Sequence, residues 1–370
     1  MLAATRIPGT ARRLALVAAC FVGAIGTARA ADSLAELIQA GNRGAALAKI
    51  AAGADVNAAQ GDGTTPLHWA VYKVDAELVA ALLERGAKPN VVNKYGSSPL
   101  AEAVKIADAR LVKMLLDAGA DVESPNDDGQ TALLLAARTG ALDVAKELVA
   151  HGANVNAKET WRGQTAVMWA ADGSFPEIVQ LLISHGADVK LRAIANDWDA
   201  QITSEPRAQY RPTGGLTALL YAARSGCSRC VRSILEAGAD TNRPNPDGIT
   251  PLAIAIDNFH YDTARVLLDA GANPHTWDWW GRTPLYVAVD MSSYNSRFGA
   301  RPAPSETTAL DVITRLLDAG VNPNPQLVMH RPGRGGNSGR FIDDLLTSGA
   351  TPLLRAAIGH DVEAVRALLE

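Results

Sequence analysis

A period of 33 residues constrains the fold of this chain more than any other feature. A triplet of Thr or Ser, then Pro or Ala, then Leu or Val recurs, and its first copies are spaced by 33, 33 and 34 residues. The copies begin at Thr65, Ser98, Thr131, Thr165, Thr217, Thr250, Thr283 and Thr351. A period of about 20–50 residues predicts a repeat protein, in which each unit stacks on its neighbours.

Each period contains the signals of two short helices. Thr65 followed by Pro66 suits a helix N-cap with proline at the first helical position, where the missing N–H costs nothing. The apolar residues of segment 76–86 recur at helical spacing, and Gly86 suits a left-handed cap after that helix. A polar stretch then leads to the next unit. With abundant Ala and Leu and only short β-branched runs, the pattern predicts an all-α fold.

The residues of these units resemble the ankyrin repeat. Thr65–Ala70 reads TPLHWA, which is similar to the family's T-P-L-H-x-A, and LLERGAKPN, LLDAGADVE, LVAHGANVN and LLEAGADTN are similar to its second-helix ending. The resemblance covers residues 32–370. It implies an ankyrin-repeat solenoid of about nine units with short β-hairpin fingers between them. It also implies protein binding, without naming the ligand.

The two terminal units depart from the pattern. Segment 32–57 lacks TPLH but keeps the spacing, so we predict an N-terminal capping repeat whose first helix is capped by Asp32. The sequence stops at VRALLE, inside a second helix and before its Gly. Because a solenoid needs a polar terminal cap, we expect this last repeat to be truncated, within a longer chain.

Residues 1–30 have the pattern of a signal peptide. Arg12 and Arg13 precede an apolar run over 14–25, and Ala28 and Ala30 supply the small residues of a cleavage site. The run is shorter than the ~20 residues needed to span a bilayer, so no membrane span is predicted. The repeat domain would therefore comprise residues 31–370 of an exported protein, either periplasmic or secreted.

A second interpretation of the same segment is a lipoprotein. Val17–Cys20 reads VAAC, which resembles a lipoprotein box and would place a lipid anchor on Cys20. The apolar stretch continues through Ile25, whereas a lipoprotein usually becomes polar there. Simple export is the favoured interpretation.

Three insertions interrupt the period, near residues 194–214, 292–306 and 326–344. The first and third fall in the polar segments between units, where ankyrin proteins form projecting fingers. The second falls between the two helices of one unit. Insertions in repeat proteins map to loops, which commonly carry function, and this role is favoured for the two finger insertions. The alternative is a surface extension of low energetic cost.

No catalytic or metal site is predicted. Cys227 and Cys230 form a C-x-x-C motif at the start of a second helix, which leaves open a local disulfide, two small packing residues or a redox pair. A structural zinc site needs four ligands, and residues 31–370 contain no further Cys.

The remaining candidate residues give no further functional signal. Five of the seven His occupy repeat positions, and HRPGRGGNSGR is only weakly similar to RGG segments. A formal net charge of −4 gives no support to nucleic-acid binding. We predict no enzyme activity and no cofactor.

Aromatic residues are concentrated at the predicted finger tips. Aromatics make up 5% of the chain, yet HTWDWWGRT at 275–283 holds three Trp. The usual residues at these tips are polar, but aromatic residues replace them in three of the six tips. Aromatic and Arg side chains are enriched at binding hot spots. The predicted partner-binding residues are Tyr95, Trp161, Arg162, Trp198, Trp279 and Trp280. The alternative is that a tip Trp packs on its own hairpin or covers an insertion.

The sequence therefore predicts a monomeric, non-catalytic module that recognises a protein or peptide outside the cytoplasm, through finger tips and concave helix faces. The alternative function is the recognition region of a larger exported enzyme, whose catalytic domain would lie beyond residue 370.

Overall fold

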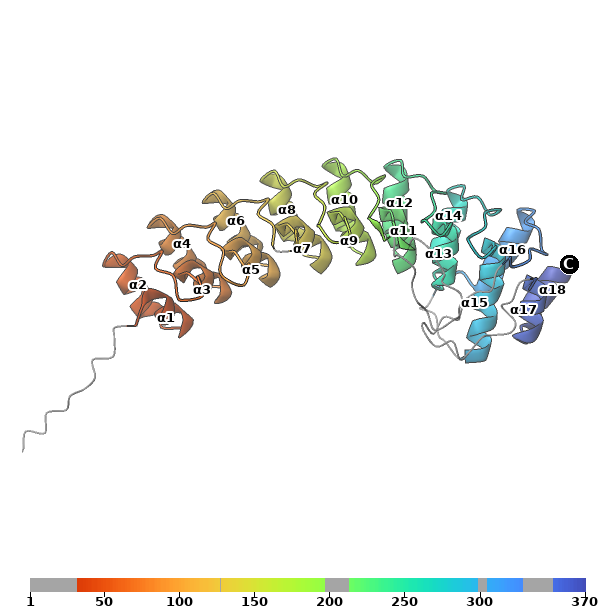
Figure 1. The fold of residues 1–370 in the computed structure, drawn as a ribbon, viewed down its shortest axis with the longest axis horizontal. Helices are drawn as coiled ribbons and strands as arrows, with labels where there is room; N and C mark the ends of the chain where they lie inside the picture. Colours follow the sequence, from red (N-terminus) through yellow and green to blue (C-terminus); the bar gives the residue numbers. More distant parts are fainter. Residues whose placement is uncertain (1–31, 127, 197–212, 299–304, 329–348) are drawn as a thin grey trace, which may run out of the picture.

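The computed structural model describes residues 32–126, 128–196, 213–298, 305–328 and 349–370. These residues form nine pairs of antiparallel helices that stack side by side in an elongated arc (Figure 1). Odd-numbered helices line the concave side of the arc and even-numbered helices the convex side. The predicted all-α solenoid of about nine units is confirmed. The pairs are α1 (Leu34–Gln39) and α2 (Arg43–Ala51), α3 (Pro66–Tyr72) and α4 (Ala76–Glu84), α5 (Pro99–Ile106) and α6 (Ala109–Asp117), α7 (Ala132–Thr139) and α8 (Leu142–Ala150), α9 (Ala166–Asp172) and α10 (Pro176–Ser184), α11 (Ala218–Ser225) and α12 (Ser228–Glu236), α13 (Pro251–Asp257) and α14 (Tyr261–Asp269), α15 (Pro284–Phe298) and α16 (Ala309–Asp318), and α17 (Pro352–Ile358) and α18 (Val362–Leu369).

The recurring Thr or Ser begins most of the concave helices by capping a free N–H group, although Thr165 at α9 makes no such bond. The Thr65 hydroxyl accepts the backbone N–H of His68, and Pro66 occupies the first helical position of α3. The His68 ring contacts the Thr65 cap through Nδ1, and its Nε2 lies 3.0 Å from the carbonyl oxygen of Ser97 in the next unit. One side chain thus caps its own helix and ties two units together.

A single run of apolar side chains fills the space between successive helix pairs. Leu67, Leu82, Leu115 and Leu148 are among its fully buried members, each contributed by a different helix. Every unit buries its apolar face only against the units before and after it, as expected for a solenoid. Among the described helices, none has both the length and the apolar character to cross a bilayer.

Two local predictions differ from the structure. The N-cap of α1 is Ser33, which forms a capping box with Glu36, and not the predicted Asp32. The box satisfies two N–H groups reciprocally, and Asp32 stands one residue too early to form it. The insertion near 292–306 is also not entirely a loop, because α15 continues through it as far as Phe298.

The insertion near 194–214 begins and ends in a short hairpin. Strand β1 (Ala195–Asn196) pairs antiparallel with β2 (Thr213–Gly214). This places the ends of the insertion at the finger between α10 and α11.

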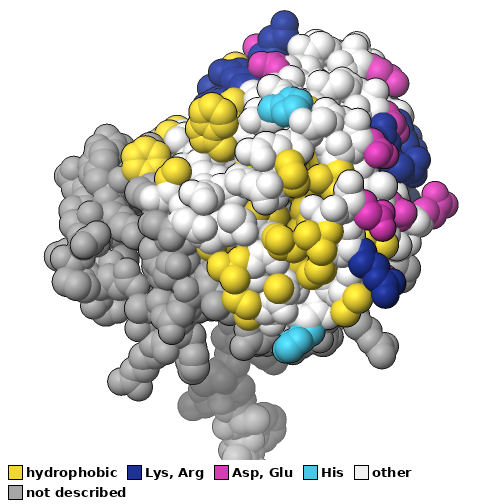
Figure 2. All heavy atoms as spheres, turned by 90° about the vertical axis from the view of Figure 1, so that its right-hand side faces the viewer, with side chains coloured by type: hydrophobic (Ala, Val, Ile, Leu, Met, Phe, Trp, Pro, Cys, Tyr) yellow, Lys and Arg dark blue, Asp and Glu magenta, His cyan; other side chains and the backbone are white. Residues whose placement is uncertain are grey.

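The outer face of the last helix pair is apolar and exposed. Figure 2 shows hydrophobic side chains gathered on this end of the molecule. Leu354 of α17 and Val362 and Leu369 of α18 contribute exposed side chains. Their counterparts two units earlier include Ala253 and Tyr261, which are buried. The face that each inner unit turns toward its successor is therefore open to solvent in the last one.

The buried imidazole of His68 is expected to make stability depend on pH. Burial lowers the pKa of His68 below the usual 6.5, against the opposing effect of the Ser97 carbonyl. The unfolded chain therefore takes up a proton at a higher pH than the folded chain does. The contribution of His68 to the free energy of unfolding should be fully present above about pH 6.5, and it should be lost as the pH drops toward the folded-state pKa.

Urea denaturation at a series of pH values checks this, with His68→Asn as the comparison. The variant should lose less stability than the wild type between about pH 7 and pH 5. His260, whose pKa is also lowered by burial, leaves both proteins a residual dependence of the same sign. Parallel stability curves for the two proteins would contradict the assignment to His68.

Candidate partner-binding site

Backbone hydrogen bonds join five pairs of neighbouring fingers. Backbone N–H groups of one finger donate to carbonyl oxygens of the preceding one, at 2.7–3.2 Å. The pairs are Lys94 to Asp62, Thr160 to Asp128, Ile194 to Arg162, Trp279 to Asp247 and Val328 to Trp280. Tip residues are therefore held by backbone contacts between units, and the direction of each side chain is set by its place in the turn.

The finger at 278–282 shows how the turn directs its side chains. The carboxylate of Asp278 accepts the backbone N–H of Trp280 at 3.0 Å and of Arg282 at 2.9 Å, and it also binds Arg282 Nε at 2.6 Å. The guanidinium of Arg282 lies over the Trp280 ring, 5.2 Å from its centroid. Asp278, Trp280 and Arg282 consequently turn inward together.

Trp280 is therefore not an exposed tip residue as predicted. Its side chain is only 6% exposed, whereas Trp279 is 52% exposed and Trp277 73%. Outward and inward residues alternate along this segment, so the outward partner of Trp279 is Trp277. Trp277 is absent from the predicted binding residues, although a two-residue alternation of outward and inward side chains would have indicated it.

The other predicted tip residues that the structure describes are exposed to solvent. Tyr95 and Trp161 project into solvent, with 76% and 75% of their surfaces exposed. Arg162 is exposed too, and its guanidinium lies 5.0 Å from the centroid of the Trp161 ring. Trp198 falls outside the described residues. The structure does not bring Tyr95 or Trp161 together with the other Trp residues, since they lie on separate fingers.

Trp277 and Trp279 line a pocket of about 560 Å³ between the finger at 275–283 and the segment 321–328. Val321, Pro325 and Val328 form the opposite wall. Sequence reasoning could not find this site because its two sides are separated by α15, the second insertion and α16.

The concave helix faces carry aromatic side chains that are already engaged. Arg138 lies over the Trp169 ring at 5.7 Å. The Tyr221 hydroxyl accepts Gln164 Nε2 at 2.7 Å and its ring is buried. Trp69 donates its indole N–H to Gln60 at 2.8 Å. Except for Tyr72 of α3, which is 59% exposed, the described aromatic side chains of the concave helices are less exposed than the outward aromatic side chains of the finger tips.

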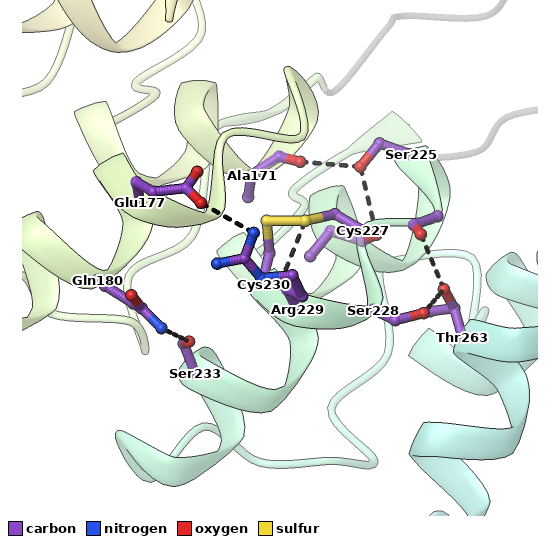
Figure 3. The surroundings of a disulfide bond; sticks show 12 residues. Ala171, Glu177, Gln180, Ser225, Cys227, Ser228, Arg229, Cys230, Ser233 and Thr263 are labelled. Carbon is purple, nitrogen blue, oxygen red and sulfur yellow. Dashed lines mark hydrogen bonds and ion pairs between the residues drawn. A yellow bond between two sulfur atoms is a disulfide. The ribbon is translucent and has the colours of Figure 1, made fainter. Parts of the chain in front are cut away.

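Cys227 and Cys230 are joined by a disulfide at the start of α12 (Figure 3). Both residues are buried, and Cys227 occupies the N-cap position of the helix. Close by, Arg229 pairs with Glu177 of α10 at 2.8 Å, and Ser228 is hydrogen-bonded to Thr263 of α14 at 2.8 Å. The bridge therefore lies where three successive units meet. In the part of the chain that is described, no group of three His, Cys, Asp or Glu side chains is placed to hold a metal ion.

Comparison with known protein families identifies the family of this chain. A family described as "Ankyrin repeats (3 copies)" matches residues 35–125, 101–193, 199–278 and 219–297, more than half of the chain. The chain belongs to the ankyrin-repeat family. No curated protein matches it.

Among solved structures, the chain is similar to the human ASB11 ankyrin repeat domain. The two share 24% identity with a TM-score of 0.52, over 66% of this chain and all of the other. At this identity the likeness shows the fold alone. Ankyrin repeats are generally protein-interaction modules, and their fold is typically non-catalytic.

Proposed function

We propose that this protein is a non-catalytic module that binds a protein or peptide partner outside the cytoplasm through its finger tips, supported by the concave helix faces. The observation that carries the proposal is the exposure of four aromatic side chains, Tyr95, Trp161, Trp277 and Trp279, along one row of fingers. Each is more than half exposed. Large exposed aromatics cost solvation free energy, which burial against a partner recovers.

The fingers suit recognition because their backbones are preorganised. The hydrogen bonds between neighbouring fingers hold the tips in place before any partner arrives, so little conformational entropy is lost on binding. Arg162 beside Trp161 adds a charged group to an aromatic one, a combination frequent at binding hot spots. The leader pattern of residues 1–30 supports the proposed role outside the cytoplasm, and a monomer is the proposed state.

Site-specific crosslinking in the native host tests the proposal. A photoreactive phenylalanine analogue would replace Tyr95, Trp161 or Trp279 in the exported protein, and Lys113 on the convex helix α6 would serve as the control position. We expect the tip positions to crosslink the same partner and Lys113 to give none. Mass spectrometry of the purified protein should also find Ala31 as the first residue.

The energetic contribution of the tips is measured with alanine variants. Trp161→Ala and Trp279→Ala should each weaken binding of the crosslinked partner by about tenfold or more, with unchanged melting. Partner binding that survives replacement of all four exposed tip aromatics would refute the proposed surface. Equal crosslinking from Lys113 would do so too.

A further inference from the structure

The pocket between Trp277 and Val328 has an unusual chemical character. Its lining contains no Lys, Arg or Glu among the described residues, and its one Asp, Asp278, is buried. That carboxylate is already engaged by Arg282 and by two backbone N–H groups. Apart from the imidazole of His275, the lining offers a charged ligand no side chain of opposite sign, so the pocket favours an uncharged ligand.

The pocket offers hydrogen-bond donors beside flat apolar surfaces. An indole Nε1–H can only donate. In the described part of the chain, neither Trp277 nor Trp279 has a side-chain hydrogen-bond partner, whereas Trp69 on α3 donates to Gln60. The amide side chains of Asn322 and Gln326 add further polar groups on the facing wall. A complementary ligand presents carbonyl oxygens and rigid apolar rings.

These properties point to one kind of ligand. We propose that this pocket binds an uncharged, proline-rich segment of a partner in the polyproline II conformation, which names the partner chemistry of the recognition role and rests on that proposed function. Proline rings pack against indole faces, and backbone carbonyls in this conformation are unpaired and accept indole N–H groups. Because proline itself lacks an N–H, such a segment demands few acceptors from the pocket.

A carbohydrate fits the pocket less well. Sugar rings also stack on tryptophan, but each hydroxyl brings a donor that needs an acceptor when it is buried. The only carboxylate of the lining is occupied by Arg282 and the turn backbone. The other side-chain acceptors of the lining are the amides of Asn322 and Gln326, the Thr283 hydroxyl and the His275 ring. Asn322 and Thr283 already accept backbone N–H groups, from Asn324 and Tyr286.

The site is built before a ligand arrives. Trp279 N–H donates to Asp247 of the preceding finger at 2.9 Å, and Val328 N–H donates to the carbonyl of Trp280 at 3.0 Å. The first bond fixes the aromatic wall and the second joins it to the facing wall. Binding to a preformed groove avoids the entropy of ordering it, which suits a ligand that is itself conformationally restricted.

The test is a titration of the repeat domain, residues 31–370, with capped, uncharged peptides of about a dozen residues. One panel would place proline at two of every three positions, and a matched panel would carry Gly and Ser in place of proline. Neutral oligosaccharides form a third panel. Isothermal titration calorimetry gives the affinity.

We expect at least one proline-rich peptide to bind saturably and its Gly/Ser counterpart to bind about tenfold more weakly or not at all. Trp277→Ala and Trp279→Ala should each weaken binding about tenfold or more. Lys113→Ala is the control, since it removes an exposed side chain of the convex helix α6 outside the pocket, and it should leave the affinity unchanged.

Three results would overturn the proposal: no saturable binding by any proline-rich peptide, binding that is unaffected in the Trp277→Ala/Trp279→Ala double variant, or saturable binding of oligosaccharides alone. If the crosslinked partner still requires Trp161 or Tyr95 in any of these cases, the general recognition role stands and only the pocket chemistry is wrong. If the partner requires no tip residue, both fail.

Discussion

Replacing Trp280 by alanine should lower the free energy of unfolding by about 3–5 kcal/mol, the usual cost of truncating a buried tryptophan. The ring is 6% exposed and supports the guanidinium of Arg282. Its removal leaves a void beside Arg282 on the buried side of the finger at 275–283. Because a solenoid is stabilised by nearest-neighbour contacts, the loss should be concentrated in the C-terminal units. Urea denaturation gives the total, and amide hydrogen exchange shows its position.

Trp279→Ala is the control, since it removes the same side chain one residue earlier from an exposed position. Its unfolding free energy should lie within about 0.5 kcal/mol of the wild type. Equal destabilisation by the two substitutions would show that both rings belong to the core. No destabilisation by Trp280→Ala would place both at the surface and would contradict the structure.

The second large effect is expected for Arg282→Met, which removes the charge and keeps much of the apolar volume. Burial lowers the pKa of Arg282, but the carboxylates of Asp257 and Asp278 outweigh it and the net shift is upward. The Arg282 side chain is 2% exposed, and its Nε lies 2.6 Å from Asp278. Losing one partner of a buried ion pair leaves a buried charge uncompensated, at a cost of about 3–5 kcal/mol.

Arg224→Met provides the comparison for this second prediction. Arg224 also pairs with an aspartate, Asp172, at 2.7 Å, and also lies over an aromatic ring, Tyr221. Its side chain is 40% exposed, however, so solvent screens the pair and the loss should stay below about 1 kcal/mol. Similar unfolding free energies for the two variants at neutral pH would show that burial does not govern the difference.

Helix positions could be predicted from the sequence because their signals are local. Thr65 and Pro66 specify the start of α3 within two residues, and Gly86 has the φ of +82° expected after the end of α4. Such signals need no knowledge of neighbouring units. The prediction failed at Asp32, where two adjacent polar residues both suited a cap and only Ser33 had Glu36 at the spacing of a capping box.

The directions of the tip tryptophans could not be obtained in the same way. The repeat pattern places Trp279 and Trp280 together at a tip, but it does not show that Asp278 engages Arg282 and draws Trp280 inward. Polar contacts within the turn and with neighbouring fingers decide which ring is exposed. The pocket could not be predicted from the sequence for a related reason, because the second insertion interrupts the repeat period between its two walls.

Because the fingers that carry the exposed aromatic tips are each hydrogen-bonded to a neighbouring finger, the spacing between these tips is set by the stacking of the units rather than by the motion of loops. A partner that occupies two tips at once would make its second contact inside an existing complex, at an effective concentration set by that spacing. Such bivalent attachment raises affinity by about 10²–10⁴ without any additional contact, and it is lost when the geometry forbids simultaneous engagement. The row of fingers would then select partners by the distance between their epitopes as well as by the chemistry of each one.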